Sequence, residues 1–132
     1  KDGNESALNT TEVLDLDGAD GTTEVITAGP TMATARWCAG AQAVRLDARR
    51  VLVVGGTDDD NEYLKSTEIL DLETMRFSAG PRMISRRSDS AAVTLDARRV
   101  LVVGGMDENS DFHRATEILD VATMAFAPGP DM

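Results

Sequence analysis

The stretch Arg49-Arg50-Val51-Leu52-Val53-Val54-Gly55-Gly56 recurs unchanged as Arg98-Arg99-Val100-Leu101-Val102-Val103-Gly104-Gly105, 49 positions further along the chain. An eight-residue identity at that spacing indicates that the chain is built from similar units. Each copy is a short run of β-branched and other apolar residues that ends in two glycines. Such a run is typical of a buried strand followed by a sharp turn. The repeat therefore predicts a repeated β-structure on which the rest of the chain can be aligned.

Other segments recur in the same register. Segments of the form Thr-Glu-Ile/Val-Leu-Asp occupy residues 11–16, 67–72 and 116–121, and a Gly-Pro pair follows each of them. The prolines and the absence of a clean 3.6-residue period argue against helices. We therefore predict an all-β fold with four short strands, A to D, in each complete unit. In the central unit they cover residues 41–46, 49–54, 67–72 and 75–79.

Four-stranded antiparallel units that repeat at this spacing are typical of the blades of a β-propeller. We expect the C–D half of a first blade at residues 1–32, a second blade at 33–83 and a third at 84–132. Lys1 aligns with Thr57, directly after a Gly-Gly pair, so strands A and B of the first blade are missing. A closed propeller has about four to eight blades. The expectation is thus an incomplete propeller, a fragment of a larger ring, with the remaining blades among its partners.

The order of these features resembles the kelch repeat. In that repeat, a strand ending in Gly-Gly precedes a variable loop, a Glu shortly before an Asp, an aromatic residue, Pro-x-Met and an Arg. The matching residues of the central copy are Gly55, Gly56, Glu68, Asp71, Phe77, Pro81, Met83 and Arg86 or Arg87, and those of the next copy are Gly104, Gly105, Glu117, Asp120, Phe126, Pro130 and Met132. The chain departs from the family pattern where Tyr and Trp are usual, with Leu70 and Phe77 in the central copy. The resemblance implies a kelch-type propeller.

Composition limits the classes of partner. The 132 residues include 23 acidic and 13 basic side chains, for a net charge of −10. Nucleic acids and anionic membranes need clustered Lys and Arg, so neither is expected as a partner. No apolar run approaches the roughly 20 residues of a membrane span. The one cysteine, Cys38, cannot form an internal disulfide, which favours a reducing compartment such as the cytoplasm.

The candidate site follows from strand direction. Because each strand of an antiparallel meander reverses the chain, the B–C and D–A loops share one rim, and loops on a rigid scaffold often carry binding residues. The B–C loops at residues 1–5, 57–62 and 106–111 are acidic, and the D–A loops supply arginines and a tryptophan. We predict that this rim binds another protein or a larger assembly, with no catalytic residue, metal or cofactor. The candidate binding residues are Asp58, Asp59, Asp60, Asp107, Glu108, Asp111, Arg36, Trp37, Arg86 and Arg87.

Simpler explanations remain open for these residues. Acidic turns are also typical of solvated loops, and Arg86 or Arg87 could form weak surface ion pairs with neighbouring loops. Trp37 lies in a two-residue insertion, where it could cover the edge of the core rather than anchor a partner. Clustered carboxylates can bind calcium, but the run from Asp58 to Asp60 lacks the spaced ligands and glycine of a calcium loop.

Some repeated acidic positions are predicted to be structural. Glu12, Glu68 and Glu117 recur at equivalent strand positions, and catalysis does not need one acid in every blade, so we expect hydrogen bonds to neighbouring backbone. Asp47 and Asp96 are predicted turn residues. The alternative function is part of a kelch-like enzyme whose active site lies in blades absent here. The sequence contains no Gly-rich phosphate loop, HExxH or nucleophile elbow.

Overall fold

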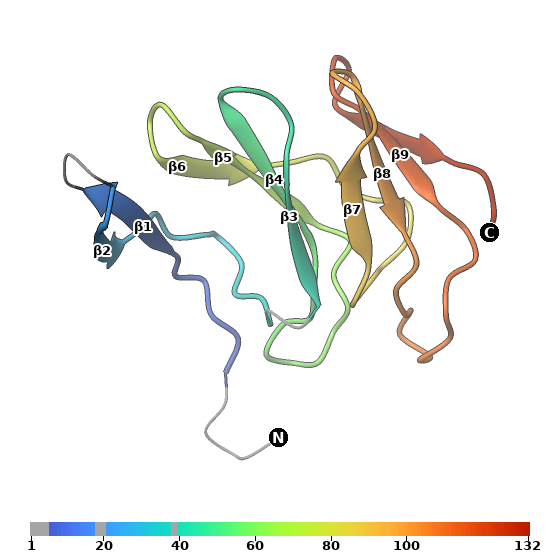
Figure 1. The fold of residues 1–132 in the computed structure, drawn as a ribbon. Helices are drawn as coiled ribbons and strands as arrows, with labels where there is room; N and C mark the ends of the chain where they lie inside the picture. The colour runs from blue at the N-terminus through green and yellow to red at the C-terminus, as the bar shows by residue number, and fades with distance from the viewer. Residues whose placement is uncertain (1–5, 18–20, 38–39) are drawn as a thin grey trace.

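The computed structural model describes residues 6–17, 21–37 and 40–132. In this part of the chain ten β-strands form three antiparallel sheets that stand side by side (Figure 1). The strands are β1 (Glu12–Asp17), β2 (Thr23–Ala28), β3 (Ala41–Arg45), β4 (Arg50–Gly55), β5 (Thr67–Asp71), β6 (Arg76–Ala79), β7 (Ala91–Thr94), β8 (Arg99–Val103), β9 (Glu117–Asp120) and β10 (Ala125–Pro128). The described residues include no helix with the length and hydropathy of a membrane span.

The second and third sheets are built alike. Each is a four-stranded meander, β3-β4-β5-β6 and β7-β8-β9-β10, while the first sheet contains only β1 and β2. The register is also shared, because Leu52 lies opposite Ile69 in the second sheet and Leu101 lies opposite Ile118 in the third. The four strands predicted for the central unit are confirmed to within one residue at each end. The all-β meander predicted from the repeat is therefore what the chain forms.

The two glycines that end each copy of the repeated stretch release the chain from its strand. Gly55 and Gly56 have φ values of +63° and +99°, and Gly104 and Gly105 have values of +69° and +89°. A side chain at Gly105 would also place its Cβ only 2.6 Å from the carbonyl oxygen of Ser88. Only glycine combines this backbone conformation with so close an approach. The Gly-Gly pair thus fixes both the turn and the spacing between neighbouring loops.

The main core lies between the second and third sheets. The second sheet contributes Leu52 and Val54, which are fully buried, and the third contributes Val100, Val102 and Leu119, also fully buried. Burying a valine or leucine side chain stabilises a fold by about 1.5–3 kcal/mol. A hydrogen bond from the Thr94 hydroxyl to the Arg45 carbonyl oxygen, at 2.8 Å, joins the innermost strands of the two sheets. These contacts hold the second and third sheets against each other as neighbours.

The row is open rather than closed. Val93 and Leu95 on the outer face of the third sheet are 48% and 44% exposed. Their equivalents in the second sheet, Val44 and Leu46, are covered by the third sheet and are only 8% and 3% exposed. The same alternation of residues therefore yields a buried face where another sheet follows and an exposed apolar face where none does.

Candidate functional site

Loops from two sheets meet at one rim, at the lower side of the view in Figure 1. The β6–β7 loop lies between the β4–β5 and β8–β9 loops. The Arg86 guanidinium donates through Nη1 to the carbonyl oxygen of Tyr63 at 2.9 Å, and His113 Nε2 lies 3.0 Å from the Arg86 carbonyl oxygen. An isolated antiparallel bridge also joins Ser88 to Met106. The loops that strand direction predicted to share a rim are therefore in direct contact.

The β4–β5 and β8–β9 loops are folded by the same device. Asp58 Oδ1 accepts the backbone N–H groups of Asp60 and Glu62, at 3.0 and 2.9 Å. In the next loop Asp107 Oδ1 accepts the N–H groups of residues 109 and 111, at 2.8 and 3.0 Å. Such side-chain-to-backbone bonds replace a regular ladder in tight turns. One carboxylate oxygen of Asp58 and one of Asp107 thus shape the loops, in addition to any role toward a partner.

A cleft of about 270 Å³ opens between these loops, and we call it the rim cleft. Its lining residues are Lys65, Ile84, Ser85, Arg86, Asp107, Glu108 and His113. The Arg86 side chain is 39% exposed and lies 3.7 Å from the Glu62 carboxylate and 3.8 Å from that of Glu108. Long, exposed ion pairs of this kind are worth at most about 1 kcal/mol. Arg86 can therefore exchange these carboxylates for those of an incoming molecule at little cost.

Arg36 and Arg87 are not on the exposed rim, which corrects the prediction for these two residues. The Arg87 side chain is fully buried, and its Nε donates to Glu117 Oε2 at 2.9 Å. Its other nitrogens donate to the carbonyl oxygens of Gly104 and Ala115, at 2.7 and 2.8 Å. Arg36 is also buried, with Nη2 at 3.2 Å from Glu68 Oε2. A guanidinium that is enclosed and ion-paired in this way inside the protein is not available to a partner.

The carboxylates opposite these arginines confirm the structural role predicted for Glu68 and Glu117, whereas the Glu12 side chain is exposed and has no such bond to a described residue, so the prediction is wrong for Glu12. Glu68 accepts the backbone N–H groups of Ala33 and Thr34, at 2.6 and 3.1 Å. Glu117 accepts the equivalent groups of Ile84 and Ser85. Each glutamate therefore fastens a strand of its own sheet to the loop that enters that sheet.

The remaining predicted residues are divided between exposed and structural positions. Asp59, Asp60 and Asp111 are exposed, and Asp59 Oδ1 also accepts the Ala7 N–H at 2.6 Å, which ties the β4–β5 loop to the segment before β1. Trp37 is half-buried and lines a different cavity, between the first and second sheets. Cys38 and the predicted acidic loop at residues 1–5 lie outside the described residues.

Only part of the predicted set therefore lines the rim cleft, namely Arg86, Asp107 and Glu108. Sequence reasoning did not assign Lys65, Ile84 or His113 to the site. An available signal was the presence of apolar side chains in polar loops: Ile84 is 52% exposed and Phe112, near His113, is 81% exposed.

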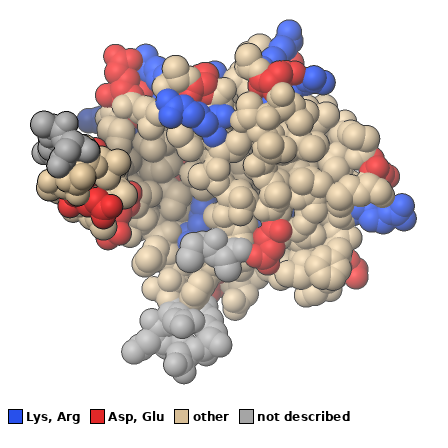
Figure 2. Space-filling model, viewed as in Figure 1, with Lys and Arg blue, Asp and Glu red and all other residues tan. Residues whose placement is uncertain are grey.

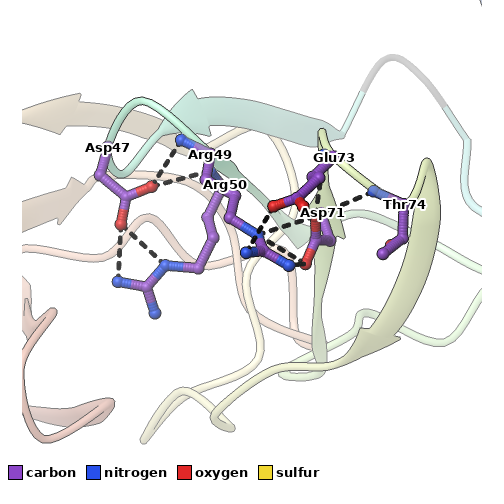
Figure 3. Close-up of polar contacts among 6 residues, drawn as sticks. All are labelled: Asp47, Arg49, Arg50, Asp71, Glu73 and Thr74. Atoms are coloured by element: carbon purple, nitrogen blue, oxygen red, sulfur yellow. Dashed lines mark hydrogen bonds and ion pairs between the residues drawn. The ribbon is translucent and has the colours of Figure 1, made fainter.

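The opposite rim carries a second charged array, shown in Figure 3. The Arg49 guanidinium spans Asp71, at 2.8 Å, and Glu73, at 2.6 Å, while Arg50 pairs with Asp47 at 2.7 Å. Asp47 also accepts the N–H groups of both arginines, which confirms it as a turn residue. The hydrogen bond from Arg49 lowers the pKa of Asp71 to about 2. Acids and bases alternate along this edge in Figure 2, so its charges are largely paired.

The third sheet repeats this array with Arg98 on Asp120 and Arg99 on Asp96. The charged pairs of this second array thus lie at the ends of hairpins, beside the turns. Among the described residues, no three His, Cys, Asp or Glu side chains are grouped closely enough to hold a metal ion. The rim cleft is therefore the candidate site of the described part of the chain.

Comparison with known proteins identifies a sequence motif and a matching fold. A model of the Kelch motif matches residues 43–84, which run from β3 past β6. The solved structure of YjhT, a kelch-type propeller, matches with a TM-score of 0.78 at 12% sequence identity. The match covers 94% of this chain and 46% of YjhT, so the chain spans about half the length of that protein. No curated protein matches the sequence. The chain thus contains a Kelch motif, and its four-stranded sheets are β-propeller blades in an open arrangement.

Proposed function

We propose that this chain is a non-enzymatic protein-interaction module that binds a partner protein through the rim cleft. The observation that carries the proposal is the position of Arg86, which is partly exposed between two weak carboxylate partners from different loops. The Kelch motif at residues 43–84 and the propeller fold support an interaction role in general. Ser85 and His113 both line the cleft, but no hydrogen bond joins them in the described part of the chain, and His113 Nε2 lies 3.0 Å from the Arg86 carbonyl oxygen instead. A nucleophile paired with a base, as acyl transfer requires, is therefore not formed by these two residues.

The loops around the cleft are suited to binding because they are already folded. Asp58 and Asp107 hold their loops by backbone hydrogen bonds, and Asn61 and Ser110 adopt matching φ values of 59° and 63°. Pre-organised loops lose little conformational freedom on binding, which increases affinity. The exposed side chain of Ile84 adds an apolar contact at the floor of this rim.

The charges of the rim indicate the chemistry of the partner segment. Acidic side chains outnumber basic ones in the two described loops, and Asp60 and Asp111 are exposed. Arg86 and Lys65 supply two cationic groups within the cleft itself. A partner segment that carries one carboxylate flanked by basic and apolar side chains matches this arrangement. Its carboxylate would face Arg86 and Lys65, and its basic side chains would face the acidic loops, so that opposite charges meet across the interface.

The test is capture of partners from a lysate of the native cells by immobilised chain. The rim variant Asp60→Lys/Asp111→Lys is compared with a control of equal charge change, Glu24→Lys/Glu73→Lys, on β2 and on the opposite rim. We expect the control to retain the partners captured by the wild type and the rim variant to lose them. Equal retention by both variants would exclude this rim as the binding surface.

A further inference from the structure

Each of the three sheets ends in a strand that has a neighbour on one side only. These last strands are β2, β6 and β10, and each pairs with the strand before it and with no other described strand. A free strand edge can pair with a strand of another protein, and natural edges are commonly protected by short length, charge or proline. A Gly-Pro pair directly follows each of these strands, so their edges can be compared position by position.

β2 is the longest of the three edge strands. It covers six residues, whereas β6 and β10 cover four each. The additional residues Thr23 and Glu24 lengthen the first hairpin at its turn end. Four of the six residues of β2 are β-branched, and all six are exposed. Because β-branched residues favour strand pairing, β2 has the composition of a pairing strand together with one open edge.

The register determines which backbone groups of β2 face the open edge. The Gly29 N–H donates to the Thr11 carbonyl oxygen at 2.8 Å, so these two residues form a hydrogen-bonded pair. Hydrogen-bonded and non-hydrogen-bonded pairs alternate along an antiparallel ladder. The N–H and carbonyl groups of Glu24, Ile26 and Ala28 therefore point away from β1, and they have no partner in the described part of the chain.

The other two edges present fewer of these groups. By the same alternation, the outward residues of β6 are Phe77 and Ala79. Those of β10 are Phe126 and Pro128, and proline has no backbone N–H. β6 also begins with a charged residue, Arg76. β2 is therefore the least protected of these edges, because it is long, contains no proline and directs three complete sets of backbone groups outward.

We propose that the β2 edge, the outward backbone groups of Glu24, Ile26 and Ala28, binds an extended segment of another protein as an added antiparallel strand. The added strand places a β-branched residue opposite Ile26 and a lysine or arginine two residues later, opposite Glu24. Glu24 is exposed and has no ion pair with another described residue, so a cation there gains an opposite charge. The small side chain of Ala28 leaves room for an aromatic residue two positions before the centre. Backbone hydrogen bonds then supply the affinity, and these three side chains supply the specificity.

A second copy of the chain fits this edge less well than a basic segment. β2 contains no lysine or arginine. Two copies of β2 paired about a twofold axis, with Ile26 opposite Ile26, place Glu24 opposite Ala28 and supply no cation. Each chain also carries a net charge of −10, and like charges oppose the association of two copies. The charges of the chain therefore favour a basic segment of a different protein.

The test measures the fluorescence anisotropy of a labelled peptide, TYTVTKT, when the intact chain is added. In the proposed register the central valine faces Ile26, the lysine faces Glu24 and the tyrosine faces Ala28. We expect saturable binding. A methyl group on the backbone nitrogen of the valine removes the N–H that the Ile26 carbonyl oxygen accepts, and it should abolish binding. The matched control carries the same methyl group on the next threonine, whose N–H points away from β2, and it should bind like the parent peptide.

Variants of the chain identify the edge that is bound. Ala28→Pro gives the first sheet the Pro-Gly-Pro sequence of residues 128–130, which the third sheet already accommodates. The proline removes an outward N–H, and binding of the peptide should weaken about threefold to tenfold. Ala79→Pro is the same change on β6 and should leave binding unchanged. Glu24→Lys should weaken binding of TYTVTKT only about threefold, because backbone bonds supply most of the affinity, and should favour the peptide TYTVTET instead.

The proposal is overturned if no saturable binding is seen, if both methylated peptides lose binding equally, or if Ala28→Pro leaves binding unchanged. Self-association of the unmodified chain that Ala28→Pro abolishes would also overturn it, because a second copy would then occupy the β2 edge. The rim variant Asp60→Lys/Asp111→Lys should bind the peptide like the wild type. Failure at the β2 edge is therefore distinguishable from failure of the rim cleft as a binding site.

Discussion

Arg49 and Asp71 form a bidentate ion pair at the end of two neighbouring strands, with Nε 3.1 and 3.0 Å from the two carboxylate oxygens and Nη2 at 2.8 Å. The repeated stretch begins with this arginine, and its second copy places Arg98 on Asp120 in the same way. A planar guanidinium matches a carboxylate in this fork-to-fork geometry. Arg49, the first residue of the repeated stretch, lies in the β3–β4 turn. Through its ion pair with Asp71 it also holds the β5–β6 turn of the same sheet.

The ion pair predicts a stability change in acid. Its hydrogen bonds lower the pKa of Asp71 from an ordinary value of 3.8 to about 2, so the folded state favours the ionised form. This contribution is present above about pH 4 and is lost as the pH falls toward 2. The difference in urea unfolding midpoint between wild type and Asp71→Asn should therefore be larger at about pH 6 than at about pH 2. An equal difference at both values would show that Asp71 does not stabilise the fold through its charge.

The two glycines at the end of β8 predict unequal effects of the same substitution. Gly104 has φ +69° and no atom within 4 Å of the position of an added Cβ, so Gly104→Ala should cost about 1 kcal/mol from backbone strain alone. Gly105 has φ +89° and would place a Cβ 2.6 Å from the Ser88 carbonyl oxygen. Gly105→Ala should cost about 3 kcal/mol, because the neighbouring loop must also move. The free energies of unfolding in urea measure this contrast, and equal losses would contradict it.

Two equivalent leucines show how much unfolding free energy a side chain contributes when a further sheet covers it. Leu52 is completely buried between the second and third sheets, whereas Leu101 is at the same position on the third sheet and remains half-exposed. Leu52→Ala should lower the free energy of unfolding by about 2–5 kcal/mol. Leu101→Ala should cost clearly less, about 1 kcal/mol, because it removes less buried surface. Equal costs would mean that the outer face of the third sheet is covered in solution.

Much of the fold could be predicted from the sequence because the signals repeat. The strands of the central unit, the Gly-Gly turns and the backbone role of Glu68 and Glu117 each follow from residues that recur at equivalent positions. The shared rim also follows, since strand direction alone decides which loops meet.

The details of the site could not be predicted in the same way. Arg86 and Arg87 are adjacent and chemically identical, and only the packing of the entering loop on Glu117 decides which of them is buried. His113 and Ile84 reach the rim cleft from different loops, and their proximity depends on how two sheets are placed relative to each other. Local patterns contain no information on such distances.

Arg87 stabilises the fold and Arg86 serves the binding rim, and equilibrium unfolding in urea separates these two roles. Arg87→Ala leaves the Glu117 carboxylate buried without its partner and should lower the free energy of unfolding by about 3–5 kcal/mol. Arg86→Ala removes only long, exposed ion pairs and should lower it by less than about 1 kcal/mol. Equal losses for the two variants, or a larger loss for Arg86→Ala, would contradict the assignment of Arg87 to the fold and of Arg86 to the binding rim.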